Sequence, residues 1–193
     1  MISATEQLVA EAGPAAVSVR EVARRAGVSS GAPFHHFPTR QALMTAVAEE
    51  ATSRLRTRIE DAVAVVPDID SPGRLRAMGR VYLGWAMDNP AQFKVVSDRR
   101  LIDYSESIQR DNEAIQALMR ETLRQSVQAA GGRTADIDAE MLALRAMAYG
   151  LARMFVDGHL PQWGVSDPRS SGRMEAVLDG LINQLVRNDW PGI

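Results

Sequence analysis

The sequence of 193 residues has no cysteine and a single lysine, Lys94. The absence of cysteine excludes disulfides, thiolate zinc sites and cysteine nucleophiles, and it fits a reducing compartment. No apolar run approaches the ~20 residues needed to span a bilayer. The first six residues lack the basic-then-apolar shape of a signal peptide. We therefore expect a soluble cytoplasmic protein with no membrane partner.

Charge is distributed unevenly along the chain. Hydrophobic residues make up 46 %, enough for a sizeable core, and the net charge is −2. The window from Ala15 to Arg40 is nevertheless +3, because it holds four arginines and one acid, so the remainder sums to −5. A small basic region on an acidic body is typical of a protein that docks on nucleic acid at one end. A solvated face would account for the same three charges.

Apolar residues recur at helical spacing between proline and glycine breaks, and no window resembles a strand with a hairpin turn. The sequence therefore predicts an all-α fold. Ser18, Thr39, Ser71 and Asn89 are the expected N-caps, the first as part of a capping box with Glu21. We expect about nine helices, over Ile2–Ala12, Val19–Arg25, Ser30–Phe37, Arg40–Val66, Gly73–Asp88, a sixth from Pro90, Ser107–Ala129, Ile137–Val156 and a ninth from Met174 to Val186.

The segment from Val17 to Phe37, VSVREVARRAGVSSGAPFHHF, predicts a helix-turn-helix. Gly27 supplies the positive φ that a tight turn between two helices needs. Val28 is expected to tuck between the helices, and Ser29 or Ser30 to cap the second one. That second helix would enter a major groove of DNA with its N-terminal end first.

The same segment resembles the TetR (tetracycline-repressor-like, TetR/AcrR) family of transcriptional regulators. The resemblance covers roughly residues 2–47 without a gap, and the length and helical remainder also look like that family. It rests on the pattern AxxAGVSxGxxxxHF followed by PxxxAL, which is filled here by Ala23, Ala26, Gly27, Val28, Ser29, Gly31, His36, Phe37, Pro38, Ala42 and Leu43.

The resemblance implies two domains: a helix-turn-helix DNA-binding domain over residues 1–47, and a helical ligand-binding and dimerisation domain over residues 48–193. It also implies phosphate contacts from Ser18, Arg20 and Arg40, whereas Arg24 and Arg25 are more simply interpreted as solvated. The positions that would face bases and backbone are Ser29, Ser30, Gly31, Ala32, Phe34, His35 and His36.

Three features depart from the family pattern. Ala32-Pro33-Phe34 stands where the family usually has Thr-Leu-Tyr, so two hydroxyls are lost and both side chains offer only apolar contact, for example to a thymine methyl. Pro33 disfavours helical geometry at Ala32, so we expect a recognition helix that starts late or sits tilted. The chain also begins inside the first helix, without the family's basic arm, which predicts modest non-specific affinity.

The C-terminal region resembles a TetR-like type with an aromatic helix, an Asn-Pro break and a Trp…His-Gly penultimate helix, although Arg145 and Tyr149-Gly150 fill the last positions here. An effector pocket is expected to use adaptable methionines and flat rings, although ordinary core packing explains each of them as well. Arg145 would anchor either an acidic ligand or an acid across a subunit interface. The candidate residues are Met78, Tyr82, Trp85, Phe93, Met119, Arg145, Met147 and Phe155, with Trp163 as a further one.

We therefore expect a homodimeric, ligand-responsive repressor that binds a palindromic operator in double-stranded DNA, with the last two helices of each subunit at the interface. Two alternatives stand beside it. A helical-bundle enzyme would need a catalytic motif such as HExxH, GxxxxGK or GxSxG, and none is present. A dimerisation module that has lost DNA binding is the other. His35 and His36 are adjacent, point about 100° apart on a helix and cannot share a metal ion, so no metal, cofactor or catalytic residue is expected.

Overall fold

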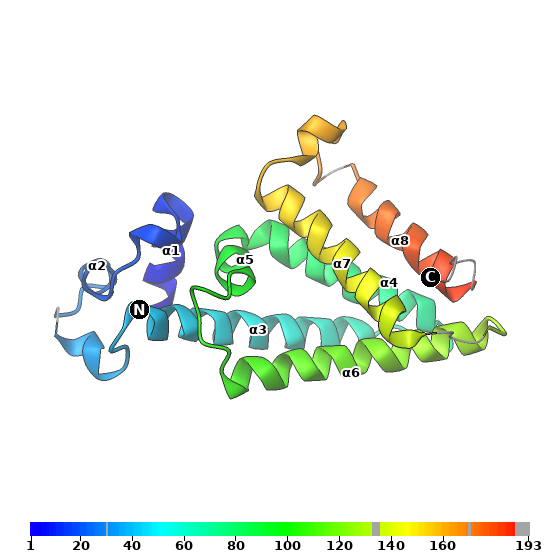
Figure 1. The fold of residues 1–193 in the computed structure, drawn as a ribbon, viewed down its shortest axis with the longest axis horizontal. Coiled ribbons are helices and arrows are strands. Elements are labelled where there is room, and N and C mark those ends of the chain that lie inside the picture. The colour runs from blue at the N-terminus through cyan, green and yellow to red at the C-terminus, as the bar shows by residue number, and fades with distance from the viewer. Residues whose placement is uncertain (30, 133–135, 170, 188–193) are drawn as a thin grey trace. The chain divides into compact units, whose positions relative to one another are not determined.

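The computed structural model describes residues 1–29, 31–132, 136–169 and 171–187, and over these ranges the chain is all-helical, as the sequence predicts. Eight α-helices and three short 3-10 helices follow one another along the described chain (Figure 1). Their bounds are α1 Ile2–Ala12, η1 Pro14–Ala16, α2 Val19–Arg25, η2 Ala32–His35, α3 Arg40–Ala64, α4 Ser71–Asp88, α5 Pro90–Ser97, α6 Glu106–Ala129, α7 Ile137–Val156, η3 Leu160–Trp163 and α8 Arg173–Val186.

The expected helix over Ser30–Phe37 is wrong as an α-helix. The described part of this segment is the 3-10 helix η2, with proline at its second position. Pro33 has no N–H to donate and disfavours α-geometry at Ala32, so the tighter 3-10 turn forms in its place. Ser30 lies outside the described residues.

Of the four predicted caps, Ser71 and Asn89 need correction, and Ser18 and Thr39 are confirmed. Ser71 is already inside α4, and the side chain that accepts the Gly73 N–H, at 3.0 Å, is that of Asp70. Asn89 occupies the N-cap of α5 but makes no side-chain cap hydrogen bond. Thr39 accepts the Ala42 N–H at 3.0 Å, as predicted. Four bounds shift as well: α3 ends at Ala64, α4 begins at Ser71, α6 begins at Glu106 and α8 begins at Arg173.

The chain packs into two compact units, and the division falls inside the long helices α3 and α6. Unit 1 comprises residues 1–54 and 89–112, and unit 2 comprises residues 55–88 and 113–193. The predicted functional boundary between residues 47 and 48 stays a prediction.

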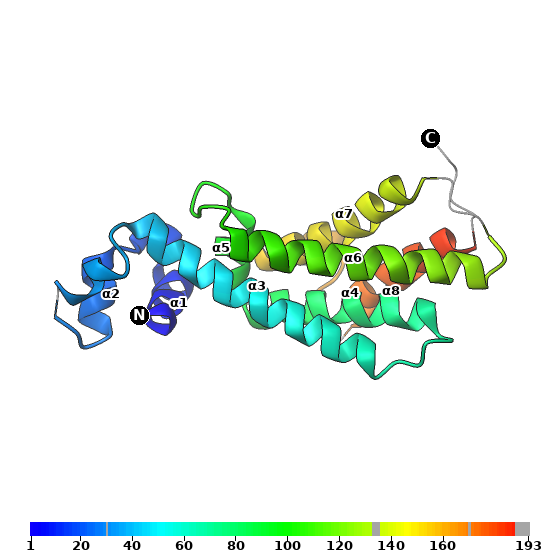
Figure 2. The ribbon, with the colours of Figure 1, turned by 90° about the horizontal axis from the view of Figure 1, so that it is seen from below.

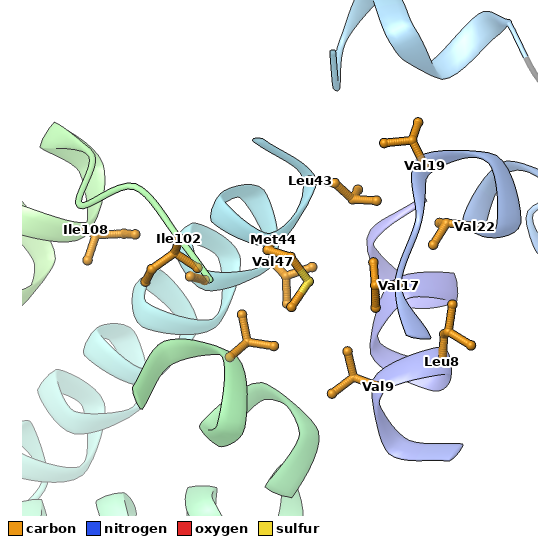
Figure 3. Close-up of a cluster of buried hydrophobic side chains, with 12 residues drawn as sticks. Leu8, Val9, Val17, Val19, Val22, Leu43, Met44, Val47, Ile102 and Ile108 are labelled. Carbon is orange, nitrogen blue, oxygen red and sulfur yellow. The ribbon is translucent and has the colours of Figure 1, made fainter. Parts of the chain in front are cut away.

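Unit 1 has a core of apolar side chains from α1, from α2 and the residue pair before it, from the first turns of α3, from α5, and from the first turn of α6 and the segment before it (Figure 3). Leu43, Met44 and Val47 of α3 are fully buried in this cluster. The buried members are Leu8, Val9, Val17, Val19, Val22, Leu43, Met44, Val47, Ala48, Val95, Ile102 and Ile108.

Unit 2 is organised around α4, which packs against both α7 and α8 (Figures 1 and 2). Gly79 permits the close approach of α8, because a Cβ at this position would lie 2.1 Å from a Leu178 methyl carbon. Arg80 of α4 is 3.0 Å from Asp179 of α8, and Arg76 donates to Asn183 at 2.6 Å. The α4–α8 contact therefore combines a close approach of the two helices at Gly79 with polar side-chain pairs between them.

Candidate functional site

The helix-turn-helix segment in unit 1 is built on a capped helix and a glycine turn. Ser18 accepts the Glu21 N–H at 3.2 Å, so the predicted N-cap is present. At the other end, Gly27 has φ +69°, its N–H reaches the Arg24 carbonyl at 3.3 Å, and the Val28 N–H reaches the Ala23 carbonyl at 3.1 Å. These two bonds form a Schellman motif, which satisfies the last carbonyls of α2 and turns the chain sharply.

The turn does not bury Val28, contrary to the sequence expectation. Its side chain is 44 % exposed, whereas Val22 and Ala23 of α2 and Pro33 of η2 are buried. Val28 therefore lacks the hydrophobic contact with the helix that often accompanies a Schellman motif, and Pro33 is the buried apolar residue of the second element.

The predicted base-facing positions that the structure describes lie on one short exposed stretch. Phe34 is 41 % exposed, and the other side chains of the set are also exposed. The structure therefore brings six of the seven predicted positions together at the surface of unit 1, while Ser30 is outside its description. The six are Ser29, Gly31, Ala32, Phe34, His35 and His36.

The arginines of α2 differ in their partners. Glu21 accepts Arg24 Nη2 at 2.7 Å and Arg25 Nε at 3.1 Å, and Arg25 Nη1 also reaches Glu11 at 2.5 Å. The hydrogen bonds from Arg24 and Arg25 lower the pKa of Glu21 to about 2. Arg20 has no hydrogen-bond or ion-pair partner among the described residues, and it is exposed.

Arg40 is half-buried at the start of α3, where Nη2 donates to the Pro14 carbonyl at 2.8 Å. Its Nε is buried without a hydrogen-bond partner in the described part of the chain. The guanidinium is thus partly committed to holding η1 against α3, and its predicted phosphate contact stays a prediction.

Sequence reasoning missed a polar latch between α3 and the segment before α6. We use this name for Gln41, Thr45, Glu49, Asp103 and Ser105. Gln41 donates to Asp103 at 2.8 Å, the Asp103 N–H donates to Thr45 at 2.9 Å, and Ser105 donates to Glu49 at 2.6 Å. The signal was visible as three polar residues spaced by four, beside the apolar stripe of the same helix.

The predicted effector residues of unit 2 lie mainly on α4 and α7. Met78 and Trp85 are buried, and the rings of Tyr82 and Trp85 are 6.1 Å apart between centroids. Met119, Met147 and Phe155 are half-buried. Phe93 is fully buried, but it belongs to unit 1.

The Tyr82 hydroxyl is a polar group beside these rings, and Tyr149 and Arg145 lie near it. Burial raises the pKa of Tyr82, the nearby Tyr149 raises it further, and the charge of Arg145 acts in the opposite direction. Arg145 is exposed on α7, and Arg169 lies over the Phe155 ring at 5.5 Å while its Nη1 is 2.9 Å from Asp88. Trp163 is 74 % exposed.

A hollow of about 440 Å³ in unit 2 is lined by other residues than those predicted. Arg74 faces it and is already engaged by Asp68 and by the Val66 carbonyl. Its lining is Asp68, Ser71, Arg74, Gln125, Gln128 and Ala129.

Within the described ranges, no three histidine, aspartate or glutamate side chains converge in a way that could hold a metal ion. The helices of those ranges also include none with the length and hydropathy that crossing a membrane demands.

Family profiles match both the N-terminal and the C-terminal part of this chain. The family profile "Bacterial regulatory proteins, tetR family" matches residues 1–47, and the profile "Tetracyclin repressor-like, C-terminal domain" matches residues 75–180. The HTH-type transcriptional regulator BetI of Escherichia coli is 30 % identical over 191 residues, covering 83 % of this chain and 92 % of the relative.

Solved structures share the fold. A TetR-family regulatory protein from Rhodococcus RHA1 has a TM-score of 0.76 at 25 % identity, with 96 % of this chain and 94 % of that chain covered. The fold alone is shared with FadR of Bacillus subtilis in complex with stearoyl-CoA, with a TM-score of 0.71, 14 % identity and coverage of 96 % and 95 %. The Trp…His-Gly subtype expected for the C-terminal region stays a prediction. The relatives are regulators and not enzymes, and this chain belongs to the TetR family of DNA-binding transcriptional regulators.

Proposed function

We propose that this protein is a ligand-responsive repressor that acts in the cytoplasm and binds a palindromic operator as a homodimer. The observation that carries the DNA-binding part is a short set of exposed residues after the capped helix α2: Ser29, Gly31, Ala32, Phe34, His35 and His36. A rigid scaffold that presents a short exposed element is the arrangement by which helix-turn-helix proteins enter a major groove.

Arg20 supports the phosphate-binding side of this proposal. It stands two residues after the N-cap Ser18, on a helix whose Arg24 and Arg25 are neutralised by acids. A guanidinium without a protein partner is free to pair with a phosphate at full charge. Arg20 is therefore the residue of α2 that we expect to contact the DNA backbone.

The test is selection of binding fragments from genomic DNA by the purified protein, at two salt concentrations. Enrichment of a palindrome is expected, and the logarithm of affinity should fall linearly with the logarithm of salt. Arg20→Ala should reduce that slope by about one for each subunit. Arg24→Ala is the matched control on the same helix and should leave the slope nearly unchanged. No enrichment at either salt would favour the alternative of a dimerisation module without DNA binding.

The exposed faces of α7 and α8 support dimerisation. The apolar stripe of α8 is mostly buried within the chain, so it does not by itself demand a partner. Leu142 is 68 %, Tyr149 43 % and Val177 46 % exposed, and each lies on one of these two helices. Exposed apolar side chains on neighbouring long helices are suited to an isologous four-helix contact.

Leu142→Arg should convert the dimer to a monomer in analytical ultracentrifugation and weaken operator binding. Trp163→Arg is the control, because Trp163 is more exposed than Leu142 and lies outside α7 and α8. A Leu142→Arg protein that remains dimeric would place the interface elsewhere.

The effector would be a small molecule with an apolar body, bound beside Tyr82 and Trp85 of α4. It would lower operator affinity because it binds more tightly to the conformation that binds DNA less well. Arg145 is exposed on α7, as are Leu142 three residues before it and Tyr149 four residues after it, which favours an interface role over a pocket role. Thermal shift with octanoate and with octanol separates these roles. A preference for octanoate that Arg145→Gln removes would assign Arg145 to the pocket, whereas a shift of Arg145→Gln toward monomer would assign it to the interface.

A further inference from the structure

Apolar side chains are unusually prominent on the recognition surface of unit 1, by which we mean residues 28–36 without Ser30. Val28 and Phe34 are 44 % and 41 % exposed, and the methyl group of Ala32 is exposed between them in sequence. Ala32 and Phe34 flank the buried Pro33, and the Val28 N–H is bonded to the Ala23 carbonyl in the Schellman turn.

Several backbone N–H groups of this surface donate to internal hydrogen bonds. The Ala32 N–H donates to the Ser29 carbonyl at 3.2 Å, and the Phe34 N–H donates to the Gly31 carbonyl at 3.3 Å. The His36 N–H donates to the Pro33 carbonyl at 3.0 Å, and Pro33 itself has no N–H. These N–H groups are occupied, so we look to the side chains of this surface for sequence discrimination.

The side chains that read purines by paired hydrogen bonds are missing from residues 28–37. This stretch of sequence contains no arginine, lysine, asparagine or glutamine. Arginine or lysine is the usual partner of guanine, and asparagine or glutamine is the usual partner of adenine, because each can make two bonds to one base edge. Arg24 and Arg25, which precede the turn, are held by Glu21 and Glu11.

We propose that Phe34 and Ala32 select operator half-sites by packing against the 5-methyl groups of thymine. The C5-methyl of thymine is the one apolar feature that the base pairs present in the major groove, so it is the feature that an apolar reading surface can distinguish. This inference rests on the proposed DNA-binding function and names what that function recognises. His35 and His36 supply the polar contacts of the same surface.

The experiment removes only methyl groups and leaves the protein unchanged. The operator obtained by selection is synthesised with uracil in place of thymine inside the two half-sites, and separately with uracil only in the flanking DNA. Each buried methyl group lost should weaken binding about fourfold, so one methyl per half-site predicts a loss of roughly tenfold or more for the dimer. Uracil in the flanks should have no effect.

Protein variants assign the effect to a residue. Phe34→Ala should bind thymine and uracil operators almost equally, while Phe34→Tyr, which keeps the ring, should retain the difference. Val28→Ala tests whether the third exposed apolar group takes part.

Two outcomes separate this inference from the proposed function. Selection of a palindrome whose binding is insensitive to uracil would overturn the thymine inference and leave the DNA-binding proposal intact. Failure to select any palindrome would contradict the DNA-binding proposal itself, before uracil is introduced.

Discussion

Unit 1 and unit 2 both expose apolar side chains, but they do so on different scaffolds. In unit 1, Val28 and Phe34 are exposed on a turn and on a 3-10 helix that have internal backbone hydrogen bonds. In unit 2 Leu142 and Val177 lie on helices of 20 and 14 residues. A short rigid element suits insertion into a groove, and a long helical face suits pairing with a second helix. The scaffold therefore indicates what kind of partner an exposed apolar side chain meets.

The largest change in the free energy of unfolding is expected from truncating a core side chain of unit 1. Comparing it with truncation of an exposed side chain distinguishes residues that stabilise the unit from residues that recognise DNA. Leu43→Ala removes a fully buried side chain and should lower the free energy of unfolding by about 3 kcal/mol. Phe34→Ala, on the exposed surface of the same unit, should change it by less than about 0.5 kcal/mol. Urea unfolding of both variants measures the difference. A comparable loss in the two would mean that Phe34 is part of the core and not a recognition residue.

The second prediction concerns the helix packing of unit 2. Gly79→Val should lower the free energy of unfolding by about 2 kcal/mol, because its side chain would collide with Leu178. Gly84→Ala on the same helix meets no atom within 4 Å. It should raise stability by about 0.5–1 kcal/mol through helix propensity. Thermal unfolding distinguishes them, and a neutral Gly79→Val would show that α8 can move away from α4 without cost.

Sequence reasoning was most successful where local signals and burial agree. The bounds of α1, α2 and α7 are those predicted, because each has strong apolar spacing and clear breaks at its ends. The cap at Ser18 and the positive φ of Gly27 were likewise predicted from local signals, whereas the base-facing positions came from the family resemblance and stay a prediction.

The sequence predictions fail where two local preferences compete, or where contacts between residues far apart in the sequence determine the structure. The residues from Ser30 to Phe37 have a helical pattern, but Pro33 disfavours α-helical geometry. The sequence shows both preferences, and it does not show which of them prevails. Asp70 displaced Ser71 as the cap of α4 because both residues can accept the same N–H, and only geometry chooses between them. The polar latch joins residues 56 to 62 positions apart, a pairing that periodicity cannot reveal.

The polar latch gives a third, smaller prediction. Thr45→Val keeps the shape of a buried side chain but removes the hydroxyl that accepts the Asp103 N–H. The free energy of unfolding should fall by about 1 kcal/mol. Hydrogen exchange should show faster exchange at Asp103. Thr57→Val, at an exposed position further along α3, is the control. Unchanged exchange at Asp103 would mean that the latch contributes nothing to the order of unit 1.

The smallest stability effect is expected at Glu21, where stability and DNA affinity should change in opposite directions. The pKa of Glu21 is lowered to about 2 by Arg24 and Arg25, so the ionised carboxylate is favoured by folding. Its contribution is present above the ordinary pKa of 4.5 and is lost as pH falls from there toward 2. Glu21→Gln should therefore be slightly less stable than the parent at pH 7, and the difference should vanish in acid.

The same substitution tests the electrostatics of recognition. Glu21→Gln frees Arg24 from its 2.7 Å ion pair and raises the positive charge of α2, so DNA should bind more tightly and with a steeper salt dependence. Fluorescence anisotropy with the selected operator, repeated over a range of salt, measures both. Glu121→Gln is the matched control, because Glu121 of α6 is likewise paired with an arginine, at 2.7 Å, but belongs to unit 2. Equal gains in the two variants would show that overall charge governs affinity. A gain confined to Glu21→Gln would show that Glu21 moderates the DNA affinity of α2 by occupying two of its arginines.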